Sequence, residues 1–139
     1  MRIQLRRVEA ALLMTITAAV VTYSVRGADE KAQPRITGTY SDMHYVSDAG
    51  DVIGTEIKIV FTGTDFEGAL QIAEGSPGQL ILVHVEREGN SVSFAIPDNS
   101  PYAGNFRGSI SGGALRGDFQ FKTGGSETVV LRRGKSYWD

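Results

Sequence analysis

The segment around Gly112 and Gly113 constrains the fold of this chain more than any other part of the sequence. Two adjacent glycines can adopt the positive φ angles of a primed two-residue turn, whose twist suits flanking antiparallel strands. With that turn, the chain folds back between Phe106 and Phe119, and its apolar and charged side chains separate onto opposite faces. Because pattern, polarity and charge agree, the segment is predicted to be a hairpin. The predicted opposite pairs are Ile110 with Leu115, Gly108 with Gly117 and Phe106 with Phe119 on the apolar face, and Arg107 with Asp118 and Ser109 with Arg116 on the polar face.

Alternating apolar side chains predict two further hairpins upstream. A turn at Gly63-Thr64 and another at Gly89-Asn90 separate runs in which every second residue is apolar. This alternation is typical of strands with one buried face. The pairs expected from these turns are Phe61 with Phe66, Ile59 with Gly68 and Ile57 with Leu70, then Val85 with Phe94 and Val83 with Ile96.

The last hairpin, around residues 124–126, allows two registers. A two-residue loop would pair Lys122 with Glu127 and would turn the apolar row of the final strand away from the core. A three-residue loop with a bulge keeps that row inward, and we favour it because a one-residue slip would expose a whole apolar face. The favoured register pairs Phe121 with Val129 and Phe119 with Leu131, and it sets Asp118 between Arg107 and Arg132.

Strands separated by glycine-rich turns continue through residues 35–139, with no stretch of helical period. We expect one all-β domain of seven or eight sequential antiparallel strands, which has to close or to stack as a sandwich to hide its edges. Inward-facing glycines suit strongly bent strands, so a single small up-and-down β-barrel is favoured over a sandwich. These glycines are Gly38, Gly68, Gly108 and Gly117.

One predicted strand, residues 79–87, is apolar on both of its faces. Its alternation assigns Ile81, Val83 and Val85 to the core, which leaves Leu80 and Leu82 on the outer face. Apolar residues on both faces are typical of a strand that is covered from both sides. We therefore expect a terminus or a partner to cover this outer face.

Residues 1–27 are predicted to be a secretory signal peptide. Arg2, Arg6 and Arg7 precede an apolar run, residues 10–21, that is short for a membrane span. An uncleaved N-terminal anchor is the alternative. Residues 28–34 are polar and aperiodic and are expected to be a flexible leader. The chain has no cysteine and therefore no disulfide framework. Export without cysteine is ordinary for a bacterial periplasmic protein, so we expect a periplasmic or secreted protein of a Gram-negative bacterium.

The charge balance argues against nucleic acid as a partner. The whole chain carries 14 basic and 16 acidic residues, a net charge of −2 at pH 7. Removal of residues 1–27 would leave 10 basic and 15 acidic residues, whereas nucleic acid and anionic lipid both require a basic face. We expect neither a nucleic-acid partner nor membrane insertion of the mature body.

Short motifs in the first and last predicted strands carry a family resemblance. Gly38-Thr39-Tyr40 is similar to the Gly-x-Trp element that opens lipocalin- and avidin-like barrels of the calycin type. Arg132 or Arg133 stands where an arginine of those barrels stacks on the aromatic ring. The chain also resembles small exported β-proteins of the Gram-negative envelope that end in Leu-x-Arg. The resemblance implies a barrel with room for side chains or for one small ligand, and it implies no catalytic residue.

The histidines and carboxylates suggest structure rather than chemistry. His44 lies near Asp42, Asp48 and Asp51, but Asp and Gly are the residues that a turn at this place requires. His84 is expected on the outer face of its strand, and no serine lies in a Gly-x-Ser-x-Gly elbow. We therefore predict no enzyme activity, no metal site and no cofactor.

Aromatic residues are the candidate contacts for a ligand or partner. Tyr102 follows two prolines in residues 97–102, so it would either contact a partner or lie over the barrel mouth. Trp138, the only tryptophan, is expected to plug an open barrel end or to anchor a partner. Tyr40 and Phe94 complete this set.

The leading hypothesis is an exported, non-enzymatic binding protein that takes a small apolar ligand or a protein partner at the loop end of its barrel. The alternative is a cavity-free structural or interaction protein of the envelope, such as an inhibitor or an assembly factor. The interior distinguishes them, because six internal phenylalanines either fill it or line a hollow of about 300 Å³ or more. They are Phe61, Phe66, Phe94, Phe106, Phe119 and Phe121.

Overall fold

The computed structural model describes residues 35–139, the range predicted to form the barrel. The predicted signal peptide, residues 1–27, and the leader, residues 28–34, lie outside the described residues. Every regular element in the described range is a strand, so the predicted all-β class is confirmed. The strands are β1 (Gly38–Ser41), β2 (His44–Val46), β3 (Asp51–Phe61), β4 (Phe66–Gly75), β5 (Ile81–Glu88), β6 (Ser91–Ile96), β7 (Gly104–Ser111), β8 (Ala114–Phe121) and β9 (Ser126–Gly134).

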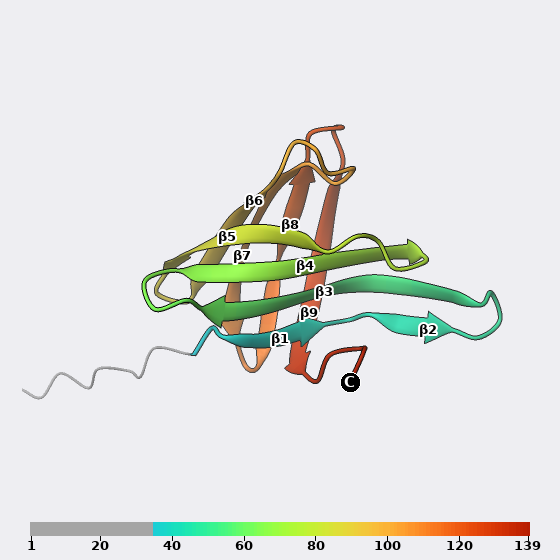
Figure 1. Ribbon diagram of the computed structural model, residues 1–139, viewed down its shortest axis with the longest axis horizontal. Coiled ribbons are helices and arrows are strands. Elements are labelled where there is room, and N and C mark those ends of the chain that lie inside the picture. Colours follow the sequence, from blue (N-terminus) through green and yellow to red (C-terminus); the bar gives the residue numbers. More distant parts are fainter. Residues whose placement is uncertain (1–34) are drawn as a thin grey trace, which may run out of the picture. The chain divides into compact units, whose positions relative to one another are not determined.

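The strands form a closed antiparallel barrel with up-and-down order. From β3 to β9 each strand pairs with the next, β9 returns to β1, and β1 pairs with β3. Eight strands complete this ring, and β2 is an extra strand that prolongs the sheet along the start of β3. In Figure 1, β3, β4 and β5 run across the view while β6 to β9 run steeply across them. The predicted up-and-down barrel is therefore confirmed, and the sandwich is excluded.

The hairpin register predicted around Gly112 and Gly113 is confirmed at every pair. Both glycines have positive φ angles, 56° and 72°, as a primed turn requires. The pairs at Gly63-Thr64 are also confirmed. At Gly89-Asn90 the predicted register holds, but the ladder contains only the three pairs next to the turn. The confirmed pairs of the first hairpin run from Phe106 opposite Phe119 to Ile110 opposite Leu115.

The predicted register of the last hairpin is wrong. The loop has four residues, 122–125, and is held by hydrogen bonds between Phe121 and Gly125 (2.9 Å) and between Gly124 and Phe121 (3.0 Å). Asp118 therefore faces Thr128, whose hydroxyl donates to the carboxylate at 2.5 Å, and not Arg132. A shift by an even number of residues keeps the same side chains inward, so sidedness could not discriminate between these registers.

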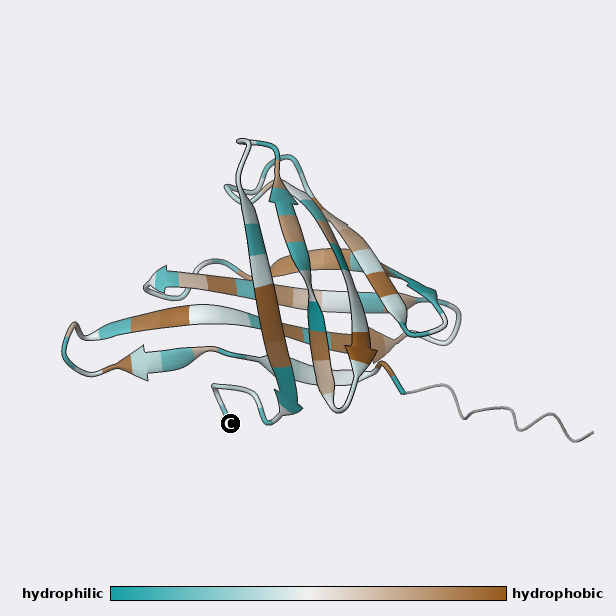
Figure 2. Ribbon diagram, turned by 180° about the vertical axis from the view of Figure 1, so that it is seen from behind, coloured by the Kyte–Doolittle hydropathy of each residue, from teal (hydrophilic) through white to brown (hydrophobic). Residues whose placement is uncertain are grey.

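Aromatic and aliphatic side chains fill the barrel. Phe94, Phe106 and Phe119 are almost fully buried, with ring centroids 4.8 Å apart for Phe94–Phe106 and for Phe106–Phe119. Figure 2 shows hydrophobic residues alternating with hydrophilic ones along the strands, as a filled interior requires. Phe66 and Phe121 pack at the edge of the core. The expectation that all six rings are internal is wrong for Phe61, which is 54% exposed at the end of β3.

The inward pair Gly108 and Gly117 makes room for a neighbouring ring. A Cβ atom on Gly117 would lie 2.6 Å from Cζ of Phe106 and 2.4 Å from the carbonyl oxygen of Arg107. A Cβ atom on Gly108 would meet the same ring at 2.8 Å. The bulk missing from this pair is therefore supplied by Phe106.

The arginine expected to stack on the first strand is Arg133. Its Cζ lies 5.0 Å from the centre of the Tyr40 ring, a cation–π distance. Its Nη2 also donates to the Tyr40 hydroxyl and to the carbonyl of Arg35, while Tyr40 donates to the carbonyl of Ile36 at 2.9 Å. Tyr40 is fully buried, so its place is in the core at this end of the barrel.

Candidate binding groove

Strand β5 changes its partner halfway along its length, and this change opens one corner of the barrel. Its first residues, Ile81 to Val85, pair with β4. Its last residues, Glu86 to Glu88, pair with β6. Beyond Ser93, β6 pairs only with β7. The strands β5 and β6 therefore diverge from their shared turn, as Figure 1 shows.

The divergence leaves backbone groups of β5 facing the opening. In an antiparallel ladder, alternate residues direct their N–H and C=O groups to opposite sides of the strand. The turn closes at the pair Glu88 and Ser91. The backbone N–H and C=O groups of every second residue before Glu88, namely Glu86, His84 and Leu82, therefore point toward β6. The β5–β6 ladder ends at Glu86 and Ser93. Among the described residues, no backbone hydrogen bond outside the ladders involves Leu82 or His84. This part of β5 is an open sheet edge.

A groove of about 350 Å³ begins at Leu82 on the open edge and lies between residues 78–82 and the loop of residues 97–102. A second hollow of about 250 Å³ is lined by His84 and Glu86 of β5 and by the middle of β6. Leu80 and Leu82 are 61% and 71% exposed beside the groove. The outer face that we expected to be covered is thus bare within residues 35–139.

Tyr102 forms the far wall of the groove. Its hydroxyl lies 3.2 Å from Oε2 of Glu74, and its ring packs 6.4 Å from that of Phe121. Burial, together with the negative charges of Glu74 and Glu127, raises the pKa of Tyr102 above 10. Asp98 in the same loop forms an ion pair with Lys122 at 2.6 Å, which joins this loop to the loop of residues 122–125.

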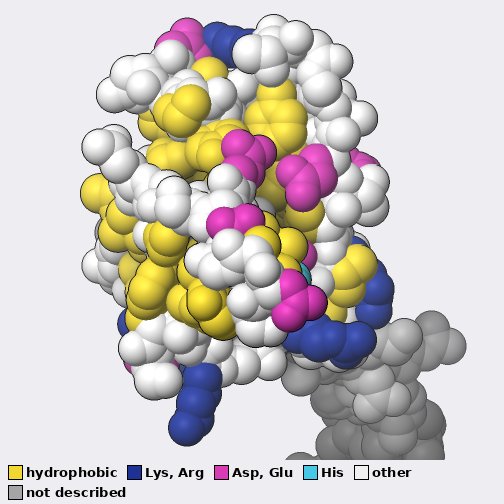
Figure 3. Space-filling view, turned by 90° about the vertical axis from the view of Figure 1, so that its right-hand side faces the viewer, with side chains coloured by type: hydrophobic (Ala, Val, Ile, Leu, Met, Phe, Trp, Pro, Cys, Tyr) yellow, Lys and Arg dark blue, Asp and Glu magenta, His cyan; other side chains and the backbone are white. Residues whose placement is uncertain are grey.

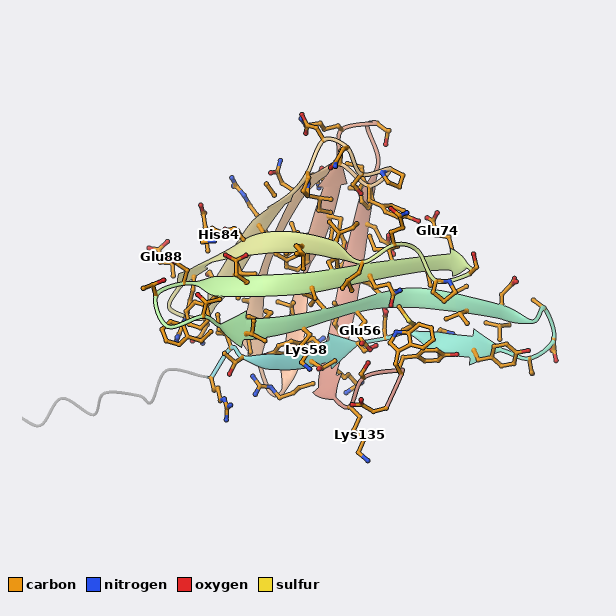
Figure 4. The ribbon with its side chains drawn as sticks, viewed as in Figure 1. Glu56, Lys58, Glu74, His84, Glu88 and Lys135 are labelled. Carbon is orange, nitrogen blue, oxygen red and sulfur yellow. The ribbon has the colours of Figure 1, made fainter. Side chains whose placement is uncertain are left out.

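This end of the groove is acidic. Within residues 35–139, neither Glu74 nor Glu127 forms an ion pair with a Lys, Arg or His side chain. Figure 4 shows Glu74 at the end of β4 where β4 approaches the loops. In Figure 3 acidic side chains stand among exposed hydrophobic ones on this face. A cationic group beside Tyr102 would therefore be attracted to the groove.

The other sequence-predicted residues lie elsewhere. Phe94 is in the core and borders the second hollow. The carboxylate of Asp42 accepts a hydrogen bond from the amide of Thr55 at 2.6 Å, and His44 contacts the carbonyl of Asp42 at 2.8 Å. In the described range no three His, Asp or Glu side chains gather as metal ligands.

The expected plug at the C-terminus is wrong. Trp138 is 56% exposed on the outside of the barrel, where its Nε1 donates to Oε1 of Gln71 at 2.9 Å. Sequence reasoning also missed Glu56, which the C-terminal segment covers. No local signal marks Glu56, because its partners lie at the other end of the chain.

His84 provides a test of the outer face beside the groove. Its Nδ1 lies 3.0 Å from Oε1 of Glu67 on the neighbouring strand. This hydrogen bond raises the pKa of His84 above its ordinary value of 6.5, although desolvation acts in the opposite direction. Because the folded state holds this proton more tightly, the pair stabilises the fold below the unfolded-state pKa and loses its effect as pH rises through the folded-state pKa.

We expect an NMR titration to give a pKa above 6.5 for His84, and Glu67→Gln to lower it. The substitution Asp48→Asn, in a distant turn, should leave the value unchanged. A His84 pKa at or below 6.5 in the wild type would contradict the hydrogen bond between His84 and Glu67.

The fold defines the class of the protein as a small closed antiparallel β-barrel, compatible with a calycin-like architecture. Comparison of the chain with protein-family models, with curated proteins and with solved structures gave no match. Within residues 35–139 there is no helix long and apolar enough to cross a membrane.

Proposed function

We propose that the chain is an exported, non-enzymatic binding protein that takes an extended segment of a protein partner in the groove beside β5. The observation that carries the proposal is the end of the β5–β6 ladder at Glu86 and Ser93, which leaves the earlier part of β5, with the exposed Leu82, unpaired on that side. A partner segment that adds as a strand would satisfy the backbone groups of the open edge and cover both leucines.

The shape of the site favours an extended polypeptide over a small ligand. The barrel interior is filled by side chains, so a ligand enclosed as in lipocalins would have to displace them. The groove and the second hollow instead follow one strand edge over several residues. Backbone groups spaced along an edge match the regular spacing of a second strand.

Charge complementarity defines the partner segment further. Glu74 and Glu127 lie near Tyr102 and have no cationic partner in the part of the chain that the structure describes, whereas residues 78–82 carry no charge. The proposed occupant is therefore a strand with alternating apolar residues and a lysine or arginine that reaches Tyr102.

Export rests on the basic residues and the apolar run within residues 1–27, and a Gram-negative periplasm is the proposed location. The resemblance to calycin-type barrels extends to Arg133 over Tyr40. Of the two hypotheses, the filled interior favours an interaction protein without an internal cavity. If the protein acts as an inhibitor or an assembly factor of the envelope, its partner would bind in this same groove.

Selection from a random octapeptide library displayed on phage tests the proposal. We expect the full chain to enrich peptides with alternating apolar residues, at least one Lys or Arg and no central proline. Leu82→Lys places a charge on the open edge and should weaken the selected peptides at least about tenfold, or 1.4 kcal/mol. Val60→Lys is the matched control, because Val60 is 43% exposed on β3 and does not line the groove.

Three results would contradict strand addition. One is the absence of any peptide enriched on the wild type over Leu82→Lys. Another is a fluorescent apolar probe, anilinonaphthalene sulfonate, that binds the wild type but not Leu82→Lys while no peptide is enriched, which would indicate a small-ligand site. The last is a dimer in solution that Leu82→Lys dissociates, which would indicate a second copy as the occupant.

A further inference from the structure

A buried carboxylate fixes the C-terminal segment against the outside of the barrel. Glu56 on β3 is only 7% exposed. One carboxylate oxygen accepts a hydrogen bond from the Ser136 hydroxyl at 2.5 Å, and the other accepts one from the amide of Tyr137 at 2.8 Å. Figure 4 shows Glu56 beside this segment, with Lys135 pointing away from it. Because a buried carboxylate needs such partners, the segment has a defined position.

Gln71 on β4 connects this segment to the groove. Its Oε1 accepts the indole N–H of Trp138 at 2.9 Å, and its Nε2 donates to the carbonyl of Gly78 at 2.8 Å. An indole nitrogen can only donate. The amide oxygen of Gln71 must therefore face Trp138, which turns its NH₂ group toward Gly78.

Gly78 begins the wall of the groove that continues to Leu82. Its amide also donates to the carbonyl of Ile72 at 2.9 Å, so both of its backbone groups are bound to β4. The β4–β5 register ends at Leu70 opposite Ile81, and beyond it Ala73 is bridged to Pro77. The segment that leads from this bridge to β5 carries Gly78 and the exposed Leu80, both of which line the groove.

We propose that Trp138 is a positioning residue of the groove, and that the docked C-terminal segment and a bound partner segment stabilise each other. The inference rests on the proposed function. Trp138 fixes the orientation of the Gln71 amide, and that amide hydrogen-bonds the carbonyl of Gly78. Gly78 is the first residue of the groove wall that the partner would contact. By linkage, a partner that binds the ordered wall also favours the docked position of Trp138.

The experiment uses the only tryptophan of the chain as its reporter. An octapeptide selected on the wild type is titrated into the full chain, and we expect the emission of Trp138 to shift on binding. Trp138→Phe keeps an aromatic ring but removes the donor, and it should weaken the peptide about fivefold. In a Gln71→Ala background the same substitution should have no further effect, because both changes break one connection.

Lys135→Ala is the matched control in the same segment, and it should bind the peptide as the wild type does. The inference alone fails if the wild type binds the peptide but Trp138→Phe binds equally well and the emission does not change. It also fails if Trp138→Phe and Gln71→Ala weaken binding additively, since each would then act separately. If no peptide binds the wild type, the proposed function itself fails and the inference falls with it.

Discussion

Gly117→Val should destabilise the protein by about 3 kcal/mol, the upper part of the range for side chains forced into a packed core. The new Cβ atom would lie 2.4 Å from the carbonyl oxygen of Arg107 and 2.6 Å from Cα of Gly108. These are backbone atoms of the paired strand β7, so they cannot move away without breaking the ladder. Urea unfolding of the full chain, followed by circular dichroism, measures the change in the free energy of unfolding.

Gly134→Val is the control for this substitution. A Cβ atom on Gly134, at the end of β9, would have no neighbour within 4 Å. Its free energy of unfolding should stay within about 0.5 kcal/mol of the wild type. If Gly117→Val changed the free energy of unfolding as little as this control, the result would contradict the close approach of β7 to β8 at Gly117.

Phe106→Ala should cost about 4 kcal/mol, as is typical when a buried aromatic ring is removed. The ring is fully buried, stacks on Phe94 and covers the Gly108–Gly117 pair. Its neighbours on one side are glycines, which have no side chains to move into the cavity. The cavity would therefore stay largely open, and the free energy of unfolding from a urea titration measures the loss.

Phe61→Ala provides the comparison for Phe106→Ala. Phe61 is 54% exposed at the end of β3, so its removal should cost less than about 1 kcal/mol. Equal losses for the two substitutions would contradict the filled interior, because a ring beside an empty space contributes less packing.

The predictability of each hairpin from the sequence depended on its turn. Gly112-Gly113 admits few turn geometries, and the residues on both sides then specify one register. Gly124 and Gly125 allow loops of several lengths. Because the correct register differs from the favoured one by an even number of residues, the same apolar side chains stay inward, and the pattern could not decide between them.

The sequence predicted the exposed leucines beside the groove but not the opening between β5 and β6. Leu80 and Leu82 on an outer face predicted that something covers β5. The change of partner within β5 depends on how a whole sheet bends to close, and no local pattern encodes that bend. The position of Trp138 was predicted wrongly, since the side chains that hold the C-terminal segment, Glu56 and Gln71, are remote in the chain.

The most direct test of strand addition at β5 is amide hydrogen exchange with and without the selected octapeptide. The amides of Leu82 and His84 face the opening, whereas those of Ile81, Val83 and Val85 are directed to β4. We predict that the peptide slows exchange at Leu82 and His84 by at least about tenfold and leaves the other three amides unchanged. A peptide that binds while the exchange of Leu82 and His84 stays the same would contradict the account.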